Sequence, residues 1–125
     1  MQSLVEKLRG LTIGVSFAGR VAPADMARYY AAADVYVQTP AVDNMPLSVL
    51  EAFASGCAVV STAAGGVPTI LTDGVHGYLV PCGDDNAAAD RVMRFIEHPD
   101  HARQMTARAR ATCEDYRWSN VRDHW

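Results

Sequence analysis

The sequence has few cysteines, no excess of basic residues and no long hydrophobic run. Its three cysteines, Cys57, Cys82 and Cys113, are far apart and form no C-x-x-C pair, so they indicate neither a disulfide framework nor a zinc site. The formal net charge is -3 and the pI is about 5.7, which leaves no basic surface for nucleic acid or anionic lipid. We therefore exclude nucleic acid as a partner and expect no metal.

No window of the sequence approaches the roughly 18 consecutive apolar residues of a membrane-spanning helix. The first ten residues, MQSLVEKLRG, lack the apolar core of a signal peptide. We expect a cytoplasmic protein without a membrane span, and peripheral association of a full-length parent with a membrane stays an open alternative. Half of the 125 residues are apolar and a fifth are charged, a composition that predicts one globular domain over residues 1–125.

Strand-like and helix-like patterns alternate along the chain. Strands are expected at 11–19, 34–39, 57–62 and 78–81, and helices at 22–34, 46–55, 86–97 and 99–116, with one helical turn within 63–70. Pro23 suits a first helical position and Gly56 a left-handed helix end, and Asp84 and Asp85 are candidate helix caps.

Helical spacing further places Met26, Tyr29 and Tyr30 in the core. The four histidines, His76, His98, His101 and His124, show no metal-ligand spacing, and we expect them at the surface.

This alternation with short connections predicts an α/β fold: a Rossmann-like open parallel sheet with helices on both faces. Such sheets usually have about five or six strands, whereas four are visible. We therefore expect at least one βα unit to be absent upstream of Met1. A sheet edge exposed in this way would favour self-association into a homo-oligomer.

Ligands of open parallel sheets bind beyond the carboxyl ends of the strands. The loops 19–23, 40–46 and 61–68 should meet there. The N–H groups of Leu47, Ser48 and Val49 begin the helix opened by Pro46 and form an anion site that fits a phosphate.

The glycine pair Gly65 and Gly66 would let a second backbone segment approach the same ligand. The alternative is that the two glycines form a turn without contacting a ligand.

Two carboxylates bracket this helix start. Asp43 lies at its mouth, and Glu51 lies five residues past Pro46, about 7.5 Å along the axis. A carboxylate can accept bonds from two neighbouring hydroxyls, as a ribose offers, and Asp43 could hold another polyol. Two hydroxyl-rich groups joined by a diphosphate describe a nucleotide sugar. The alternatives are a solvated carboxylate at Glu51 and simple helix capping by Asp43 and Asn44.

Residues 43–84, DNMPLSVLEAFASGCAVVSTAAGGVPTILTDGVHGYLVPCGD, resemble the donor-binding motif of retaining GT-B glycosyltransferases, glycosyltransferase family 4 (group 1) in particular. That family has Glu, seven residues and Glu, followed by a helix, "G.PVV" and "GG.PE". The segments VSFAGRV, YYAAADVYVQTP and YRWSNV match as well. The resemblance therefore covers nearly all of the chain from about Val15, and it implies the C-terminal half of a GT-B fold.

The resemblance implies that Asp43 and Glu51 are the catalytic carboxylates, with Glu51 on the nucleotide ribose. It also implies a set of donor-binding residues: Gly19, Arg20, Asn44, Met45, Pro46, Leu47, Ser48, Val49, Gly65 and Gly66. The substrate would be a nucleoside diphosphate sugar, without cofactor or metal. Transfer would retain the anomeric configuration through a transition state of oxocarbenium character, and the protein would act by positioning and leaving-group stabilisation.

The chain departs from the family pattern at several points. Asp43 is one methylene shorter than the usual Glu, and Thr69 stands where the family has Glu or Asp. The family's upstream basic loop and its acceptor-binding domain have no counterpart, and Arg20 is the one basic residue placed to compensate. We therefore expect a donor-binding half that is inactive alone. The alternatives are a non-catalytic nucleotide-binding module and a structural interaction domain.

Overall fold

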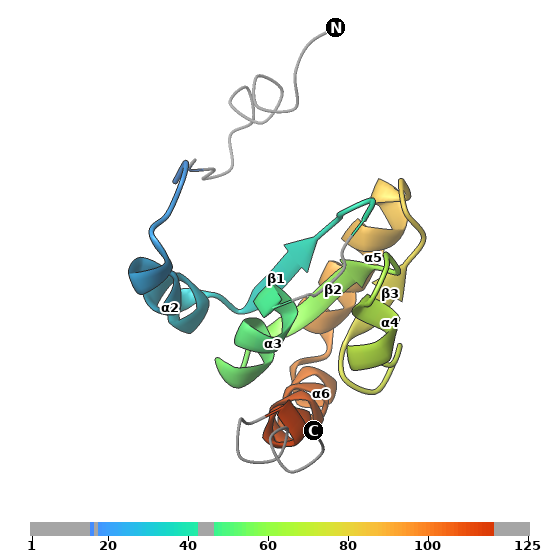
Figure 1. Ribbon diagram of the computed structural model, residues 1–125. Coiled ribbons are helices and arrows are strands. Elements are labelled where there is room, and N and C mark those ends of the chain that lie inside the picture. The colour runs from blue at the N-terminus through green and yellow to red at the C-terminus, as the bar shows by residue number, and fades with distance from the viewer. Residues whose placement is uncertain (1–15, 17, 43–46, 117–125) are drawn as a thin grey trace, which may run out of the picture.

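In the part of the chain that the structure describes, the sheet has three parallel strands in the order β1-β2-β3 (Figure 1). A computed structural model describes residues 16, 18–42 and 47–116, without the side chains of residues 115 and 116. The strands are β1 (Val35–Gln38), β2 (Ala58–Thr62) and β3 (Tyr78–Val80). The expected α/β class with a parallel sheet is confirmed.

Five α-helices and one 3-10 turn follow or link these strands in the described part of the chain. They are α2 (Pro23–Ala32), α3 (Leu47–Ala54), α4 (Val67–Ile70), α5 (Asp85–Glu97), α6 (Pro99–Thr112) and η1 (Cys113–Tyr116). Each lies where a helix or helical turn was expected, within a few residues. The strand expected at 11–19 falls largely outside the described residues, and its described members, Ser16, Ala18 and Gly19, lie in no strand.

Local signals fix the helix ends as expected. Pro23 is in the first turn of α2, and Gly56, just after α3, has φ 80°, a conformation that favours glycine. At α5 the Asp84 carboxylate accepts a hydrogen bond from the Ala87 N–H at 2.9 Å. Asp84 is thus the cap, whereas Asp85 is the first helical residue.

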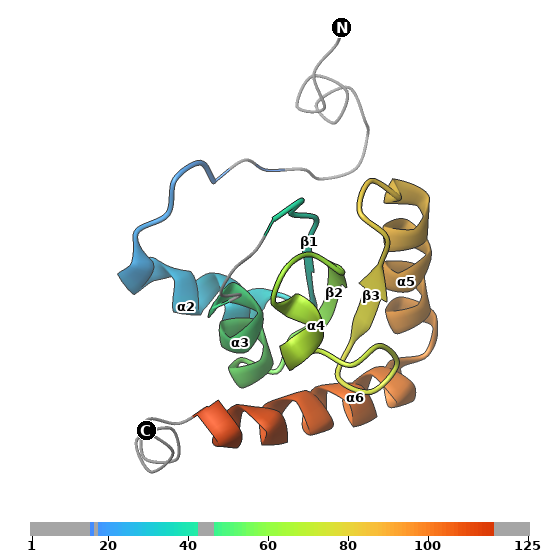
Figure 2. The same cartoon turned by 45° about the vertical axis from the view of Figure 1, so that its right-hand side comes forward.

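Helices cover both faces of the sheet, as Figures 1 and 2 show. All five residues of β2 are buried, and its side chains alternate between two core clusters. Val59 packs with residues of α2, α3 and α4, whereas Ala58 and Val60 pack with residues of α5. Helix α6 packs against both clusters: Ala109 belongs to the cluster around Val59, and Met105 belongs to the cluster around Val60.

The expectation that Tyr29 lies in the core is wrong. Tyr30 is buried, but Tyr29 is 43% exposed, under the Arg28 guanidinium. Consecutive helical residues point about 100° apart, so only one of the two tyrosines faces the sheet.

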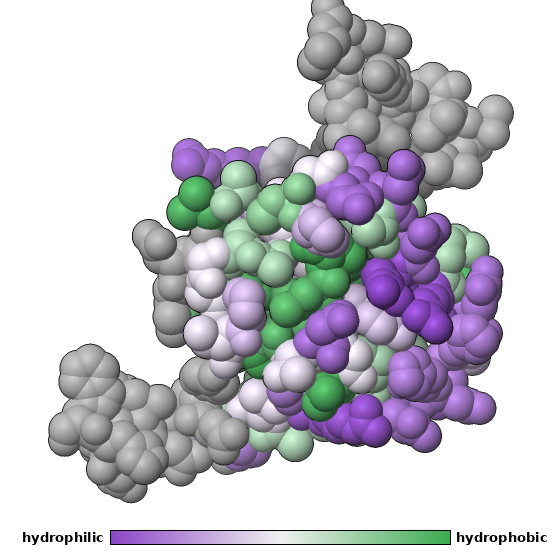
Figure 3. All heavy atoms as spheres, turned by 90° about the vertical axis from the view of Figure 1, so that its right-hand side faces the viewer, coloured by the Kyte–Doolittle hydropathy of each residue, from purple (hydrophilic) through white to green (hydrophobic). Residues whose placement is uncertain are grey.

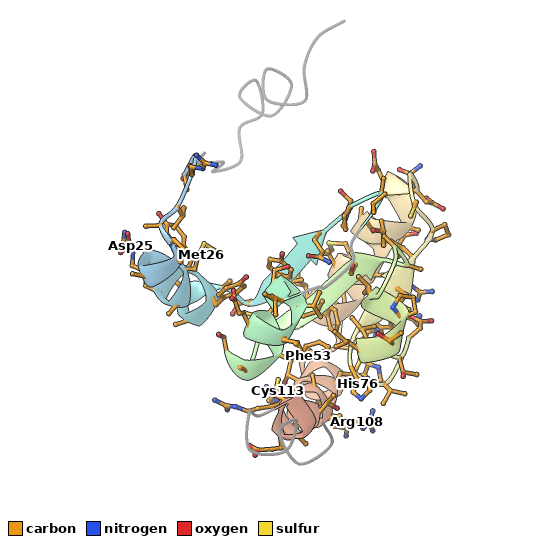
Figure 4. The ribbon with its side chains drawn as sticks, in the orientation of Figure 1. Asp25, Met26, Phe53, His76, Arg108 and Cys113 are labelled. Atoms are coloured by element: carbon orange, nitrogen blue, oxygen red, sulfur yellow. The ribbon has the colours of Figure 1, made fainter. Side chains whose placement is uncertain are left out.

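His76 is half-buried rather than at the surface. The turn after α4 folds its ring back to 6.1 Å from the Phe53 ring, between centroids, and its Nδ1 accepts the Thr72 N–H at 3.0 Å. Burial, and then the positive charge of Arg108 (Figure 4), lower the pKa of His76.

The surface of the described residues has hydrophobic as well as hydrophilic parts. On the face that Figure 3 shows, hydrophilic residues gather along one side of a strip of hydrophobic atoms. In the described part of the chain β1 pairs only with β2, and its Val37 is 44% exposed. Self-association through this edge stays a prediction.

None of the helices described here has the length and apolar character needed to cross a membrane.

Candidate functional site

The candidate site lies where β1 and β2 end. β1 ends at Gln38 and leads toward α3, and β2 ends at Thr62 and leads to α4. The two strands are parallel and adjacent, so both loops leave the same edge of the sheet. The loop between β1 and α3 includes Asp43, Asn44, Met45 and Pro46, which fall outside the described residues, and their expected roles stay predictions.

The first turn of α3 presents three residues in different ways. The Leu47 side chain is 57% exposed, whereas Val49 is completely buried. Val49 therefore belongs to the core, and its side chain does not reach a ligand. The Ser48 hydroxyl donates to Gln38 Oε1 at 2.9 Å, so this side chain is already engaged inside the protein.

Glu51 lies on α3 with its side chain exposed and borders two open grooves. One groove of about 530 Å³ runs between α3 and the end of α6, and another of about 480 Å³ runs between α2 and α3. A carboxylate in this position can be reached from either side. Sequence reasoning placed Glu51 on the flank of the helix, and the structure agrees.

The neighbour of Glu51 across the α2–α3 groove is Tyr30. Burial raises the pKa of Tyr30 most strongly, and the nearby hydroxyl of Tyr36 and the charge of Glu51 add to it. A side-chain hydrogen bond to the Glu51 carboxylate contributes as well. Tyr30 is therefore neutral, and its hydroxyl lies close enough to the Glu51 carboxylate to interact with it.

The glycine pair forms the turn into α4. Gly65 has φ 50°, a left-handed value, and Gly66 is the N-terminal cap of α4. The Thr69 hydroxyl donates to the Gly66 carbonyl at 2.5 Å, so this residue closes the turn at the position where the resembling family has an acid. The pair thus forms a turn, and its contact with a ligand stays a prediction.

Gly19 and Arg20 stand just before α2, and both are exposed. Gly19 has φ 67°. Val21, the next residue after Arg20, lines the groove between α2 and α3 together with Glu51. Arg20 is therefore next in sequence to a residue of that groove, and its expected contact with the donor stays a prediction.

Sequence reasoning missed Tyr36, Gln38 and Ser61. These side chains lie on the α3 face of the sheet and are linked by hydrogen bonds. Their one signal in the sequence was polarity at the ends of otherwise apolar strands.

The model of the family "Glycosyl transferases group 1" matches residues 2–112. The chain is also 33% identical over 121 residues to D-inositol 3-phosphate glycosyltransferase of Streptomyces griseus, covering 97% of this chain and 25% of that protein. The chain therefore belongs to the glycosyltransferase group 1 family.

Solved structures agree on the fold. HepE of Anabaena in complex with UDP and glucose matches with a TM-score of 0.82 and 28% identity, over 94% of this chain and 32% of that one. Sucrose-phosphate synthase from Thermosynechococcus elongatus matches with a TM-score of 0.80 and 29% identity, over 87% and 28%. The fold is that of a part of the GT-B glycosyltransferases.

The matches concern a segment of longer proteins. The chain spans 25% of the Streptomyces griseus relative and 34% of an α-1,4-N-acetyl-D-galactosaminyltransferase of Campylobacter jejuni. It also matches the C-terminal domain of LpcC, a group 1 protein of Francisella tularensis, over 82% of this chain and 53% of that one, with a TM-score of 0.74 and 26% identity.

Proposed function

We propose that this chain is the donor-binding part of a retaining glycosyltransferase and that it binds a nucleoside diphosphate sugar. The observation that carries the proposal is the position of Glu51, exposed on α3 between two open grooves and close to Tyr30. HepE has been solved with UDP-glucose and with UDP, which makes uridine diphosphate the first ligand to test.

In this proposal the ligand spans the carboxyl edge of the sheet. Its diphosphate accepts hydrogen bonds from the N–H groups at the start of α3, at Leu47, Ser48 and Val49, where the helix dipole favours negative charge. The Glu51 carboxylate accepts bonds from the ribose hydroxyls, and Asp43 holds the donor sugar. Gly65 and Gly66 flank the ligand.

The part played by the protein in the reaction is binding and positioning. As the bond from the anomeric carbon to the diphosphate breaks, negative charge grows on the leaving group, and the N–H groups of the first turn of α3 stabilise it. An acceptor must be held on a second surface, and water must be kept out. We propose that a separate acceptor-binding domain supplies both, and that the isolated chain shows no turnover.

A second candidate is a binding module that holds the nucleotide without reaction. It is favoured by Thr69, whose hydroxyl is used to close the turn at Gly66, and by the shorter carboxylate at Asp43. Joining the chain to an acceptor-binding domain of a group 1 relative separates the candidates, because only the enzyme part would then transfer sugar.

Calorimetric titration tests the proposal. The chain is titrated with uridine, guanosine and adenosine diphosphates and their sugar conjugates, beside Glu51→Ala. The control is Glu97→Ala, which removes an exposed carboxylate at the end of α5. We expect binding of one nucleotide, weakened by about 1–3 kcal/mol in Glu51→Ala and unchanged in the control. Equal affinities in all three proteins would refute the role of Glu51.

A further inference from the structure

The last residue of β1 connects three elements beneath the candidate site. Gln38 lies opposite Ser61 in the register of β1 and β2, and its Nε2 donates to Ser61 Oγ at 3.1 Å. Its Oε1 accepts from the Ser48 hydroxyl and from the Tyr36 hydroxyl, each at 2.9 Å. One side-chain amide thus joins β1, β2 and the first turn of α3.

The hydrogen bonds around Gln38 have a consistent direction. Two hydroxyl donors converge on its oxygen, so the amide nitrogen faces β2. Ser61 Oγ donates its own proton to the Thr62 carbonyl at 2.9 Å, which leaves it free to accept from Gln38. Ser61 is completely buried, and a buried hydroxyl that lost this partner would pay a desolvation penalty. The network therefore favours one orientation of the amide.

This network acts on the part of α3 that the proposed function uses. Ser48 lies between Leu47 and Val49, and its side chain is tied to the sheet through Gln38. The N–H groups of this turn lack partners within the helix, and their hydrogen bonds to a ligand depend on distances of about 2.7–3.2 Å. Any shift of the turn against the sheet changes those distances.

We propose that Gln38 is a positioning residue of the donor site, which sets the first turn of α3 at the height where its N–H groups meet a diphosphate. This inference rests on the proposed function. Gln38 acts through Ser48 and does not touch the ligand. The two bonds to Ser61 and Tyr36 hold the amide itself in place, so that the strand ends and the helix start move as one unit.

The test compares Gln38→Leu, which keeps a similar volume without the amide, with Ser48→Ala, which removes only the bond to α3. Gln104→Leu makes the same chemical change on the exposed side of α6 and is the control. Two readouts are taken on the intact chain. They are the NMR order parameters of the Leu47–Val49 amides without ligand, and the affinity for uridine diphosphate.

We expect lower order parameters at Leu47–Val49 in both variants and a threefold to tenfold weaker affinity, the usual effect of one hydrogen bond. The double variant should bind uridine diphosphate no more weakly than Gln38→Leu alone, because both changes break the same hydrogen bond. If Gln38 acted independently of Ser48, the losses of affinity in the two single variants would instead add in the double variant. Gln104→Leu should match the unaltered chain in both readouts.

Unchanged order parameters at Leu47–Val49 in Ser48→Ala would overturn the inference, whatever the nucleotide result. Normal affinity in Gln38→Leu would overturn it as well. Should the unaltered chain bind no nucleotide, the proposed function fails, whereas the order parameters still decide whether Gln38 holds α3. The two failures are therefore distinguishable.

Discussion

The Tyr30 ring lies against the Tyr36 ring, with centroids 5.6 Å apart and an angle of 52° between the planes. Tyr30 comes from α2 and Tyr36 from β1, and each hydroxyl serves a different part of α3. The Tyr30 hydroxyl lies near the Glu51 carboxylate, whereas the Tyr36 hydroxyl donates to Gln38, which also accepts from Ser48. This aromatic pair thus supports both polar positions that the proposed site needs on the helix.

Removing the Tyr30 hydroxyl should weaken nucleotide binding. In Tyr30→Phe the ring contact with Tyr36 remains, but Glu51 loses the neighbouring hydroxyl. We expect uridine diphosphate affinity to fall by about 1 kcal/mol, measured by calorimetry. The control is Tyr29→Phe, which removes a hydroxyl from the exposed neighbour in the same helix and should leave the affinity as it was. Equal losses in both variants would contradict the link between Tyr30 and Glu51.

Acid should destabilise the chain through His76. Its pKa is lowered in the folded state, first by burial and then by Arg108, so the unfolded chain takes up the proton more readily. The stabilisation is complete above the usual histidine pKa of about 6.5 and is lost as the pH falls through the lowered value. Each bound proton can change the free energy of unfolding by at most about 1.4 kcal/mol per pH unit.

The variant His76→Phe isolates this contribution, since it keeps a ring beside Phe53 but cannot titrate. Thermal unfolding followed from pH 7.5 to pH 5, about the range in which histidine changes charge, should show a steeper loss in the unaltered chain than in the variant. His101→Phe, at an exposed position of α6, should behave like the unaltered chain. Parallel curves for His76→Phe and the unaltered chain would count against this assignment.

Gly77 marks a close approach of two backbones. A Cβ added there would lie 2.5 Å from the Val59 carbonyl oxygen and 3.3 Å from a Leu71 methyl group. Since the oxygen belongs to the buried strand β2, it cannot move aside cheaply. We expect Gly77→Ala to lower the free energy of unfolding by about 2 kcal/mol in chemical denaturation. An unchanged denaturation midpoint would show that the strands can separate there.

The start of α5 offers a paired test of capping. Asp84 accepts the Ala87 N–H, and its replacement by Ala should cost about 1 kcal/mol of stability. Asp85 is already inside the helix and gains only from the helix dipole, so Asp85→Ala should cost about 0.5 kcal/mol or less. Denaturation curves of both variants decide which carboxylate is the cap, and equal effects would argue against the assignment.

Local features of the sequence were enough to predict most of the fold. Pro23 and Gly56 act on their own helices, and the continuous apolar run of β2 needs no knowledge of its neighbours. The flank position of Glu51 also follows from helix geometry alone. These predictions depend on residues within one or two turns of each other, and the structure confirms them.

Long-range relationships could not be predicted in the same way. The bond between Gln38 and Ser61 requires the register of β1 against β2, which nothing local specifies. The choice of Tyr30 over Tyr29 as the buried ring depends on how α2 meets the sheet, and the burial of His76 depends on the path of a turn. These contacts join separate elements, and those of Tyr30 and His76 lie against α3.

The most direct measurement for the central claim is an NMR titration of the chain with uridine diphosphate, followed residue by residue through the backbone amides. We expect the largest shifts on Leu47, Ser48 and Gly65, with Glu51 affected beside them, and we expect Glu51→Ala to reduce all of them together. Shifts gathered instead along α5 and the outer side of α6, or shifts that Glu51→Ala leaves unaltered, would contradict a donor site at the start of α3.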